Sequence, residues 1–414
     1  MSKSTSSSAR RRDFLTATAL AAAGVAGGIA QAQEERAKKA RLGIALIGAG
    51  NRGTSLFRDV QRAQREGTAI DMVAVCDAYR PRLEKAVERY GGKPYRTPEE
   101  LLKDPNVDAV FVATPDRLHA YHALQAIRAG KDVYCEKPLT HWSQFDKLKE
   151  MVKDARAHKT IFQMGTQRVS DPMYHIAKAR IERGGIGKPI HVITGLFRKG
   201  DFGERGMPID DPKAQAGPDL NWEAFLGDAP QRPFDVSRFF RWRLYMDYSG
   251  GPVTDLYPHL LAPIVYTLGL GFPKRVMAIG AQYAFHGERE VPDTFDMLAE
   301  YPEGITLSVL GSQANGSNID PMIRGTAGAV TFRESNVYVD PEPPTQNPRV
   351  DLPSFNFVYE HVRNFLGFVR TRQQPDANVE VGYHTQTALI MAMQSHITGK
   401  VARFDQDSEQ IKFD

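Results

Sequence analysis

The chain has 414 residues and a formal net charge of +4. Residues 1–32 contain four basic residues and one acidic residue, so the remainder has a formal charge of only +1. A nearly neutral chain has no electrostatic surplus for binding nucleic acid. No segment after residue 32 is long and apolar enough to span a bilayer, so we expect no stable membrane anchor. About 380 residues are more than one domain with a single hydrophobic core usually contains, which predicts two domains.

The first 32 residues have the layout of a twin-arginine signal peptide. Arg11 and Arg12 precede a weakly apolar stretch over residues 14–30, and Ala30-Gln31-Ala32 offers small residues for cleavage. The alternative interpretation is a disordered basic tail. Because this route exports folded proteins, the pattern predicts a protein that is periplasmic or otherwise exported.

Residues 33–166 alternate short apolar segments with helical ones. We predict strands at 42–47, 72–76, 108–113, 131–135 and 160–164. We predict helices at 52–66, after Pro115 and at 143–158. Strands that alternate with helices form a parallel sheet covered on both faces. The fold class is therefore α/β, with an N-terminal doubly wound Rossmann domain.

Residues 167–414 have a different rhythm and predict a second, α+β domain. We expect a helix at 171–183, a strand at 188–197 and irregular chain over 198–250. Longer strands follow at about 274–284, 294–301, 304–313 and 328–340, and two amphipathic helices, 356–372 and 382–398, close the chain. Strands grouped with helices on one side predict an open, mainly antiparallel sheet.

A glycine-rich turn joins the first strand to the first helix. Gly48 permits the tight turn, Gly50 lets the backbone approach a pyrophosphate, and Gly53 allows close packing of helix on strand. Asn51 and Arg52 open the helix, whose free N–H groups and dipole favour a phosphate. The strand before the motif and the helix after it make this a dinucleotide-binding fingerprint.

Asp77 follows the second strand and predicts the choice of cofactor. Its carboxylate could accept hydrogen bonds from the adenosine ribose and would repel a 2′-phosphate, which favours NAD over NADP. The nearby Arg80 keeps NADP possible. The alternative interpretation of Asp77 is a solvated turn residue.

Three further segments carry a family resemblance. Residues 108–116 read DAVFVATPD, residues 136–138 read EKP, and residues 250–259 read GGPVTDLYPH. In this order, the chain resembles the Gfo/Idh/MocA family over nearly all of its length after residue 32. The resemblance implies an NAD(P)-dependent oxidoreductase acting on CH–OH groups. It also implies a second domain whose sheet carries the substrate site and often the oligomer interface, hence a homodimer or homotetramer.

The resemblance also implies roles for individual residues. Along the cofactor it places Thr114, Pro115, His119 and Glu136. Beside the nicotinamide and the reacting hydroxyl it places Lys137, followed by Pro138. His259 becomes the acid/base assisted by Asp255, and Gln167 and Arg168 reach the substrate. Taken singly, each of these residues also has an ordinary structural explanation, such as a core histidine or a helix cap.

Elementary chemistry supports the catalytic assignment. A neutral histidine accepts a proton near pH 7, and the start of a predicted helix at His259 favours the neutral ring. Asp255 lies four residues earlier, which puts both on one face of a helix. Lys137 supplies positive charge to a developing alkoxide. The chain departs from the family at Tyr257, where glycine is common, and we expect Tyr257 to reach the substrate.

Aromatic and arginine residues crowd residues 234–248. A sugar ring could stack on Trp242 or Tyr245, or the loop could simply pack on the sheet or between subunits. Trp222 has the character of a packing anchor.

Other possible sites are weaker. Cys76 and Cys135 end strands that are not neighbours in the doubly wound order, so we expect buried thiols and no disulfide. No metal is expected, because the spacing of His175, His191 and His286 is unlike that of metal ligands.

Three functions remain open at this point. The leading one is an exported oxidoreductase that moves hydride between a tightly held nicotinamide cofactor and a sugar, glycoside or sugar acid. Outside the cytoplasm no free cofactor pool is expected, so a redox-assisted glycoside hydrolase or epimerase that recycles NAD in each turnover is an alternative. The third is a non-catalytic nucleotide- or sugar-binding protein.

Overall fold

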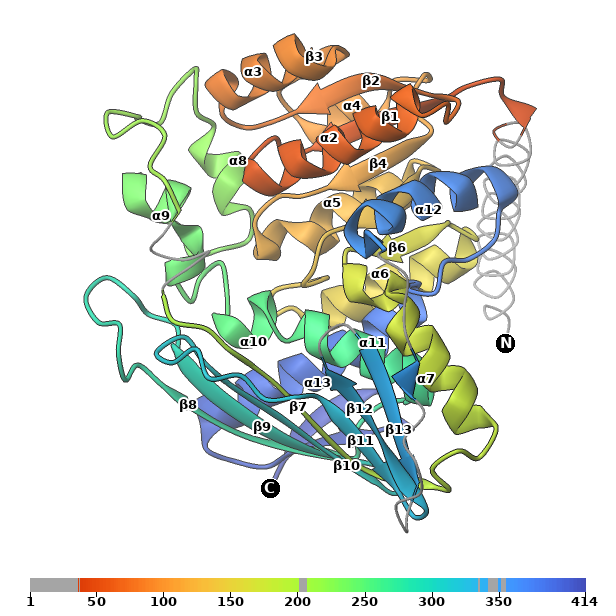
Figure 1. Cartoon of the computed structure of the whole chain (residues 1–414). Coiled ribbons are helices and arrows are strands. Elements are labelled where there is room, and N and C mark those ends of the chain that lie inside the picture. The colour runs from red at the N-terminus through yellow and green to blue at the C-terminus, as the bar shows by residue number, and fades with distance from the viewer. Residues whose placement is uncertain (1–35, 37, 201–206, 334–335, 342–348, 351–354) are drawn as a thin grey trace, which may run out of the picture.

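The computed structural model describes residues 36, 38–200, 207–333, 336–341, 349–350 and 355–414. The predicted signal peptide, residues 1–32, lies outside these residues. Two sheets organise the described chain, one near each end of the molecule, with helices packed between them (Figure 1).

The first sheet is parallel throughout. Its strands are β1 (Leu42–Ile47), β2 (Ile70–Cys76), β3 (Lys93–Tyr95), β4 (Ala109–Val112), β5 (Asp132–Cys135) and β6 (Phe162–Met164). They run in the order β3-β2-β1-β4-β5-β6, which confirms the predicted Rossmann domain. From β1 the strand order runs one way to β3, and from β4 it runs the other way to β6. Such sheets bind ligands at this switch point between β1 and β4.

Helices cover both faces of this sheet. They are α2 (Asn51–Arg65), α3 (Arg80–Tyr90), α4 (Pro98–Leu102), α5 (Asp116–Arg128) and α6 (Phe145–Ala157). A sixth helix, α12 (Phe357–Thr371), comes from the far end of the chain. Its residue Phe365 contacts Phe111 and Tyr134 of the first sheet, with ring centroids 5.3 and 5.7 Å apart. Although α12 follows the predicted boundary at residue 166, it packs on the first sheet.

The second sheet has ten strands. In sheet order they are β14 (Arg349–Val350), β13 (Asn336–Pro341), β12 (Gly328–Arg333), β11 (Met322–Gly325), β7 (Pro189–Phe197), β10 (Ile305–Ser312), β9 (Thr294–Tyr301), β8 (Arg275–Ala281), β15 (Ala402–Asp405) and β16 (Gln410–Phe413). Only β7 and β10 pair in parallel, so the predicted, mainly antiparallel sheet is confirmed.

Two details of the predicted second domain were wrong. The segment 328–340, predicted as one strand, forms two antiparallel strands, β12 and β13. The prediction missed this because the alternation of apolar and polar residues continues through both strands and hides the change of chain direction. The chain also does not close on helices, since β15 and β16 follow the last helix, α13 (Val379–Thr398).

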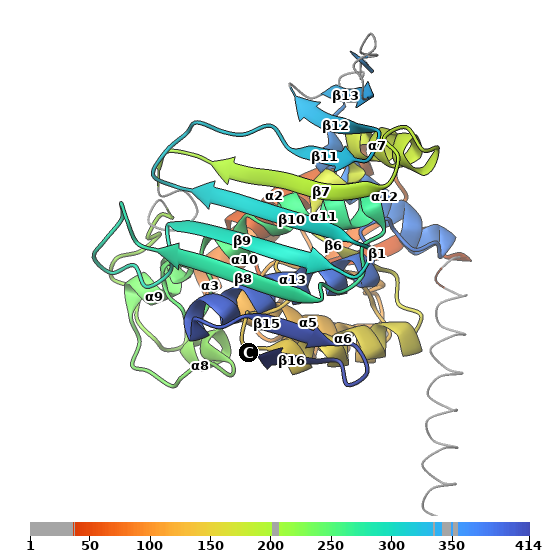
Figure 2. The ribbon, with the colours of Figure 1, turned by 90° about the horizontal axis from the view of Figure 1, so that it is seen from below.

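The second sheet has one covered and one open face. Helices η1 (Gln167–Ser170), α7 (Pro172–Glu182), α10 (Pro252–Asp255), α11 (Pro258–Leu268) and α13 lie between the two sheets. Figure 2 shows the opposite face with no helix in front of it. On the strands of this sheet Met277, Ile279 and Leu298 are exposed, and Met277 and Leu298 are cross-strand partners.

Residues 207–248, which we call the strap, connect β7 to α10. The predicted irregular segment contains the short helices α8 (Trp222–Leu226), α9 (Val236–Phe240) and η2 (Trp242–Leu244), packed around a core of aromatic side chains. Trp222 is confirmed as a packing anchor, because it is buried, stacks on Phe225 and donates its indole N–H to the Arg232 carbonyl at 2.8 Å.

Both cysteines are buried and free, as predicted. Cys76 ends β2 and Cys135 ends β5, and strands β1 and β4 lie between them. Burial raises the pKa of both thiols, which makes them unreactive packing groups.

Candidate active site

A cleft of about 490 Å³ lies at the carboxyl ends of β1, β2, β4 and β5. One wall contains every predicted cofactor residue except Gly53: Gly48, Gly50, Asn51, Arg52, Asp77, Thr114, Pro115, His119, Glu136 and Lys137. The other wall comes from the strap and contains Met207, Pro208, Ala224, Phe225, Phe239, Trp242 and Arg243. The sequence prediction therefore found one wall of the site and missed most of the other.

The glycine turn has the geometry that its motif predicts. Gly48 has φ of +96°, and an added Cβ would lie 2.7 Å from the Ala113 carbonyl oxygen. A Cβ at Gly53 would lie 1.8 Å from the Gly48 carbonyl oxygen, which explains why Gly53 packs behind the cleft. At Gly50 the nearest atom to an added Cβ is 3.7 Å away, so the backbone faces open space there. That space, before the first turn of α2, suits a pyrophosphate.

Asp77 is fixed at the end of β2. Its two carboxylate oxygens accept backbone N–H groups from Ala49 at 2.6 Å and Tyr79 at 2.8 Å. Because each oxygen keeps a further lone pair, the side chain can still accept ribose hydroxyls in the cleft. The guanidinium of Arg80, which left NADP possible, instead lies 3.2 Å from Asp219.

His119 joins the loops that follow β4 and β5. Its ring nitrogens lie 2.6 Å from the Pro138 carbonyl oxygen and 2.7 Å from the Thr114 carbonyl oxygen. Burial lowers the pKa of His119 to about 4, so the ring is neutral. A neutral ring has one N–H, so His119 donates to one of these two carbonyl oxygens. Pro138 follows a cis peptide bond at Lys137.

Glu136 connects the glycine turn to the end of β5. Arg52 donates from Nε to the Glu136 Oε1 at 2.7 Å, and Gln167 donates from Nε2 at 3.3 Å. Gln167 also donates to the Tyr134 hydroxyl at 3.1 Å. Gln167 is therefore buried behind Glu136 and does not line the cleft. We predicted that Gln167 contacts the substrate, whereas in the structure it supports Glu136.

Lys137 and Asp255 meet at the inner end of the cleft. Lys137 Nζ donates to Asp255 Oδ1 at 2.8 Å and to the Asp255 carbonyl oxygen. Arg243 Nε donates to the same Oδ1 at 3.1 Å. Burial alone would raise the pKa of the Asp255 carboxyl, but the Lys137 and Arg243 cations outweigh it and lower the pKa. Asp255 is therefore an ionised anchor that orients two cations.

His259 lies in the first turn of α11, close to Lys137 and Asp255. Desolvation of the ring and then the charge of Lys137 hold the pKa of His259 well below 6.5, with further lowering from Arg52 and Arg168. The ring is therefore neutral at pH 7 and can accept a proton. We predicted Asp255 and His259 on one continuous helix, and this was wrong. Pro258 starts a new helix after α10 ends.

The predicted substrate residues separate into two groups. Trp242 lines the cleft and Arg168 lies close enough to His259 to affect its charge. The Arg243 guanidinium covers the Trp242 ring at 4.1 Å, so that ring face is occupied by protein. Tyr257 is fully buried and donates its hydroxyl to the Phe295 carbonyl of β9, so the structure does not bring it to the cleft.

Asp116 is a site residue to which the sequence prediction gave no role. It begins α5, is buried, and accepts a hydrogen bond from Thr254 Oγ1 at 3.4 Å, while its other oxygen has no partner among the described residues. Burial raises the pKa of Asp116 to about 7, since Arg243 and Lys137 only partly offset the desolvation. Its position directly after Pro115, at the start of a helix behind a strand, was the signal that could have found it.

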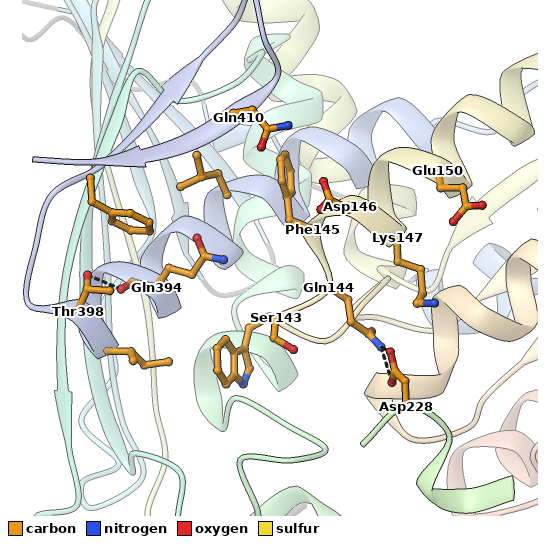
Figure 3. Close-up of a pocket in the computed structure, with 14 residues that line it drawn as sticks. Ser143, Gln144, Phe145, Asp146, Lys147, Glu150, Asp228, Gln394, Thr398 and Gln410 are labelled. Carbon is orange, nitrogen blue, oxygen red and sulfur yellow. Dashed lines mark hydrogen bonds between the residues drawn. The ribbon is translucent and has the colours of Figure 1, made fainter. Parts of the chain in front are cut away.

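A second hollow, of about 730 Å³, lies outside this site between α6, α13 and β16. Its wall includes Trp142, Phe145, Ile397 and Phe413. Figure 3 shows that Gln144 there points toward Asp228 of the strap, and its amide donates to both carboxylate oxygens at 2.9 Å. This hollow contains none of the predicted catalytic residues.

Two negative findings concern the described part of the chain. Within it, no three or more His, Cys, Asp or Glu side chains are grouped to hold a metal ion. No helix in the same residues has the length and apolar character needed to cross a membrane.

Curated relatives match about a third of the chain. Scyllo-inositol 2-dehydrogenase (NAD(+)) of Bacillus subtilis is 34% identical over 33% of this chain and 38% of its own length. Myo-inositol 2-dehydrogenase of Thermotoga maritima is 33% identical over 36% of this chain and 43% of its own length. The chain thus spans about two-fifths of the length of these relatives.

Solved structures match nearly the whole chain. Levoglucosan dehydrogenase, in complex with NADH and levoglucosan, has a TM-score of 0.69 at 17% identity, covering 88% of this chain and 99% of its own. An oxidoreductase domain protein from Kribbella flavida has a TM-score of 0.71 at 18% identity, covering 89% and 100%. At these identities the likeness concerns the fold.

Family models cover both domains. Residues 42–166 match the model described as an oxidoreductase family with an NAD-binding Rossmann fold, and residues 175–414 match the C-terminal alpha/beta domain of the same family. The cofactor of this domain is NAD, and its glycine turn and Asp77 have the geometry to bind it. The chain belongs to the Gfo/Idh/MocA oxidoreductase family.

Proposed function

We propose that this chain is an NAD-dependent oxidoreductase that transfers hydride between its cofactor and a CH–OH group of a sugar, glycoside or sugar acid. The observation that carries the proposal is the meeting of Lys137 and Asp255 in the wall of the NAD cleft, with a neutral His259 close to both. The names of the inositol dehydrogenase relatives support the substrate class.

Each residue has a defined task in this chemistry. When bound, NAD supplies the hydride acceptor. His259, whose ring is neutral, accepts the proton of the substrate hydroxyl. Lys137 places a positive charge where the substrate oxygen becomes negative. Asp255 orients the Lys137 ammonium through two hydrogen bonds and keeps a negative charge beside the imidazolium that forms.

The cofactor in this proposal stays bound through the cycle. The two walls of the cleft support this, because NAD would lie between the glycine turn and the strap. The hydride then returns to a second substrate, or to the same substrate in a redox-assisted hydrolysis or epimerisation. Denaturing the purified protein and quantifying the released nicotinamide tests this step. About one NAD(H) per chain is expected, and a chain without cofactor would contradict it.

Export by the twin-arginine route is a further part of the proposal. It rests on Arg11, Arg12 and the cleavage site in residues 1–32. Replacing both arginines by lysine in the full chain and comparing periplasmic and cytoplasmic fractions tests it. Equal amounts of both proteins in the periplasm would contradict the assignment.

We also propose a homodimer or homotetramer that uses the open sheet face. The exposed Met277, Ile279 and Leu298 support this, because they give a bare sheet an apolar surface. An Ile279→Asp variant is expected to shift the mass measured by light scattering toward the monomer. An Ile190→Asp variant, exposed on β7, is the control for a general effect of added charge.

Catalysis separates this proposal from a binding protein. Lys137→Ala and His259→Ala variants should bind NAD and fail to reduce it with carbohydrates that the natural chain oxidises. Saturable carbohydrate binding without any reduction of bound NAD, over a broad panel, would favour the non-catalytic alternative.

A further inference from the structure

The strap supplies mainly apolar side chains to a cleft whose other wall carries the glycine turn and most of the polar groups. The side chains that it contributes include Phe225, Phe239 and Trp242, all of them buried. The facing wall carries the glycine turn and Asp77, which suit phosphate and ribose. Flat apolar rings on one side and polar groups on the other match the two kinds of surface that a dinucleotide presents.

The strap is attached to the first domain beside the end of β2. Arg82 and Asp210 form an ion pair with a distance of 2.7 Å. The Arg80 N–H donates to the Asp219 carbonyl at 2.8 Å, and the Asn221 N–H donates to the Ala78 carbonyl at 3.0 Å. Tyr79 packs edge-on against Phe239 and Phe240, with ring centroids 5.7 Å apart in both pairs.

A second attachment lies beyond the end of β4. Arg117, on α5, donates to Asp228 Oδ1 at 2.8 Å and to the Asp247 carbonyl at 3.0 Å. Gln144 donates to both oxygens of the same Asp228, as Figure 3 shows. The two Arg117 contacts join residues more than a hundred positions apart in the chain.

The two attachments lie on opposite sides of the glycine turn. In the first sheet, β2 and β4 are the two neighbours of β1, and the turn follows β1. The strap therefore crosses the turn and is held on both sides of it. Figure 1 shows α8 and α9 along the edge of the molecule that carries α2 and α3. A dinucleotide on the turn would contact both the turn and the strap.

We propose that the strap is the second half of the NAD site and that its opening limits the release of the cofactor. The inference rests on the proposed function in one respect: slow release is useful to an enzyme whose cofactor is regenerated while it stays bound. Loss of the attachments should speed entry and exit together, because both pass the same barrier. The equilibrium affinity for NAD should change much less than either rate.

The test weakens both attachments by neutralising one carboxylate in each. Asp210 and Asp228 do not line the cleft, so an Asp210→Asn/Asp228→Asn double variant deletes no cofactor contact. The matched control is Glu150→Gln, because Glu150 and Asp228 are each 49% exposed and each is paired with an arginine. Stopped-flow fluorescence follows bound NADH as excess NAD displaces it from the full chain.

The double variant should release NADH about ten-fold faster or more, as expected when charged hydrogen bonds on both sides are lost. The control should keep the natural rate. A release rate of the folded double variant within about two-fold of the natural rate would overturn the inference. Circular dichroism and thermal unfolding establish that it is folded, and the two single variants provide the same comparison if the double variant is unstable.

The result is independent of turnover. Slow, strap-dependent release with no oxidation of any carbohydrate leaves this inference in place and refutes the proposed function. Fast release from a chain that oxidises carbohydrates refutes the inference and leaves the function.

Discussion

The two walls of the cleft differ in how they are built. The glycine wall is made of residues at the ends of neighbouring parallel strands, so the strand pairing brings together groups such as Asp77 and the Ala49 N–H, 2.6 Å apart. The strap wall is made of short helices around an aromatic core, held by contacts such as Arg82–Asp210, 128 residues apart. We therefore expect the glycine wall and the catalytic groups to set the chemistry, and the strap to set the rate of cofactor exchange.

The largest expected effect is on the rate of hydride transfer. Lys137→Ala should lower kcat by about 10²- to 10³-fold, the usual cost of removing one charge-stabilising group. His259→Ala should cost about 10²- to 10⁴-fold, the range for a general base. Both rates are measured with saturating carbohydrate, and NAD affinity by titration is the control. A loss that came entirely from weaker NAD binding would contradict the assigned roles.

Two glycines provide the next contrast. Gly53→Ala would place Cβ 1.8 Å from a backbone oxygen and should destabilise the domain by about 4 kcal/mol or more. Gly50→Ala meets no atom closer than 3.7 Å and should fold normally, yet weaken NAD binding by about ten-fold or more, since its Cβ would occupy pyrophosphate space. Thermal unfolding and NAD titration measure the two effects. Equal stabilities of the two variants would refute this geometry.

A smaller effect is expected at the ribose position. Asp77→Asn keeps an acceptor oxygen but loses the charge, so NAD should bind about ten-fold more weakly and NADP should be less strongly rejected. The ratio of the two dissociation constants is the measurement. An unchanged ratio would show that Asp77 does not face the ribose.

The smallest effect is on pH dependence. Oxidation needs the neutral form of His259, and the ring is protonated only as the pH falls through its lowered pKa. The acid limb of kcat/KM should therefore lie below pH 6.5. Asp116, with a pKa of about 7, should add a shallow bend near neutrality that disappears in Asp116→Asn. An acid limb above pH 7 in both proteins would contradict the neutral ring.

The sequence predicted the features that are encoded locally. The glycine turn, Asp77 and Lys137 each follow a strand, so their positions at one edge of the sheet follow from the Rossmann pattern. The order of Lys137, Asp255 and His259 along the chain was enough to bring them together in the prediction, although Pro258 divides the helix.

Features that depend on distant pairing were not predictable. Nothing local in Asp228 indicates that Arg117 and Gln144 will bind it, and the amphipathic pattern of α12 does not say which sheet it covers. Tyr257 was misplaced for a related reason. Its position near His259 suggested the cleft, whereas its side chain turns to the carbonyl of Phe295, 38 residues away.

The most direct test of the central claim is the absorbance of the nicotinamide that copurifies with the chain, recorded while carbohydrates are added one at a time. We expect reduction of about one cofactor per chain by at least one carbohydrate, reversal when an acceptor sugar is supplied, and no change in His259→Ala. Binding of carbohydrates without any reduction in the natural chain would contradict an oxidoreductase and leave a binding protein.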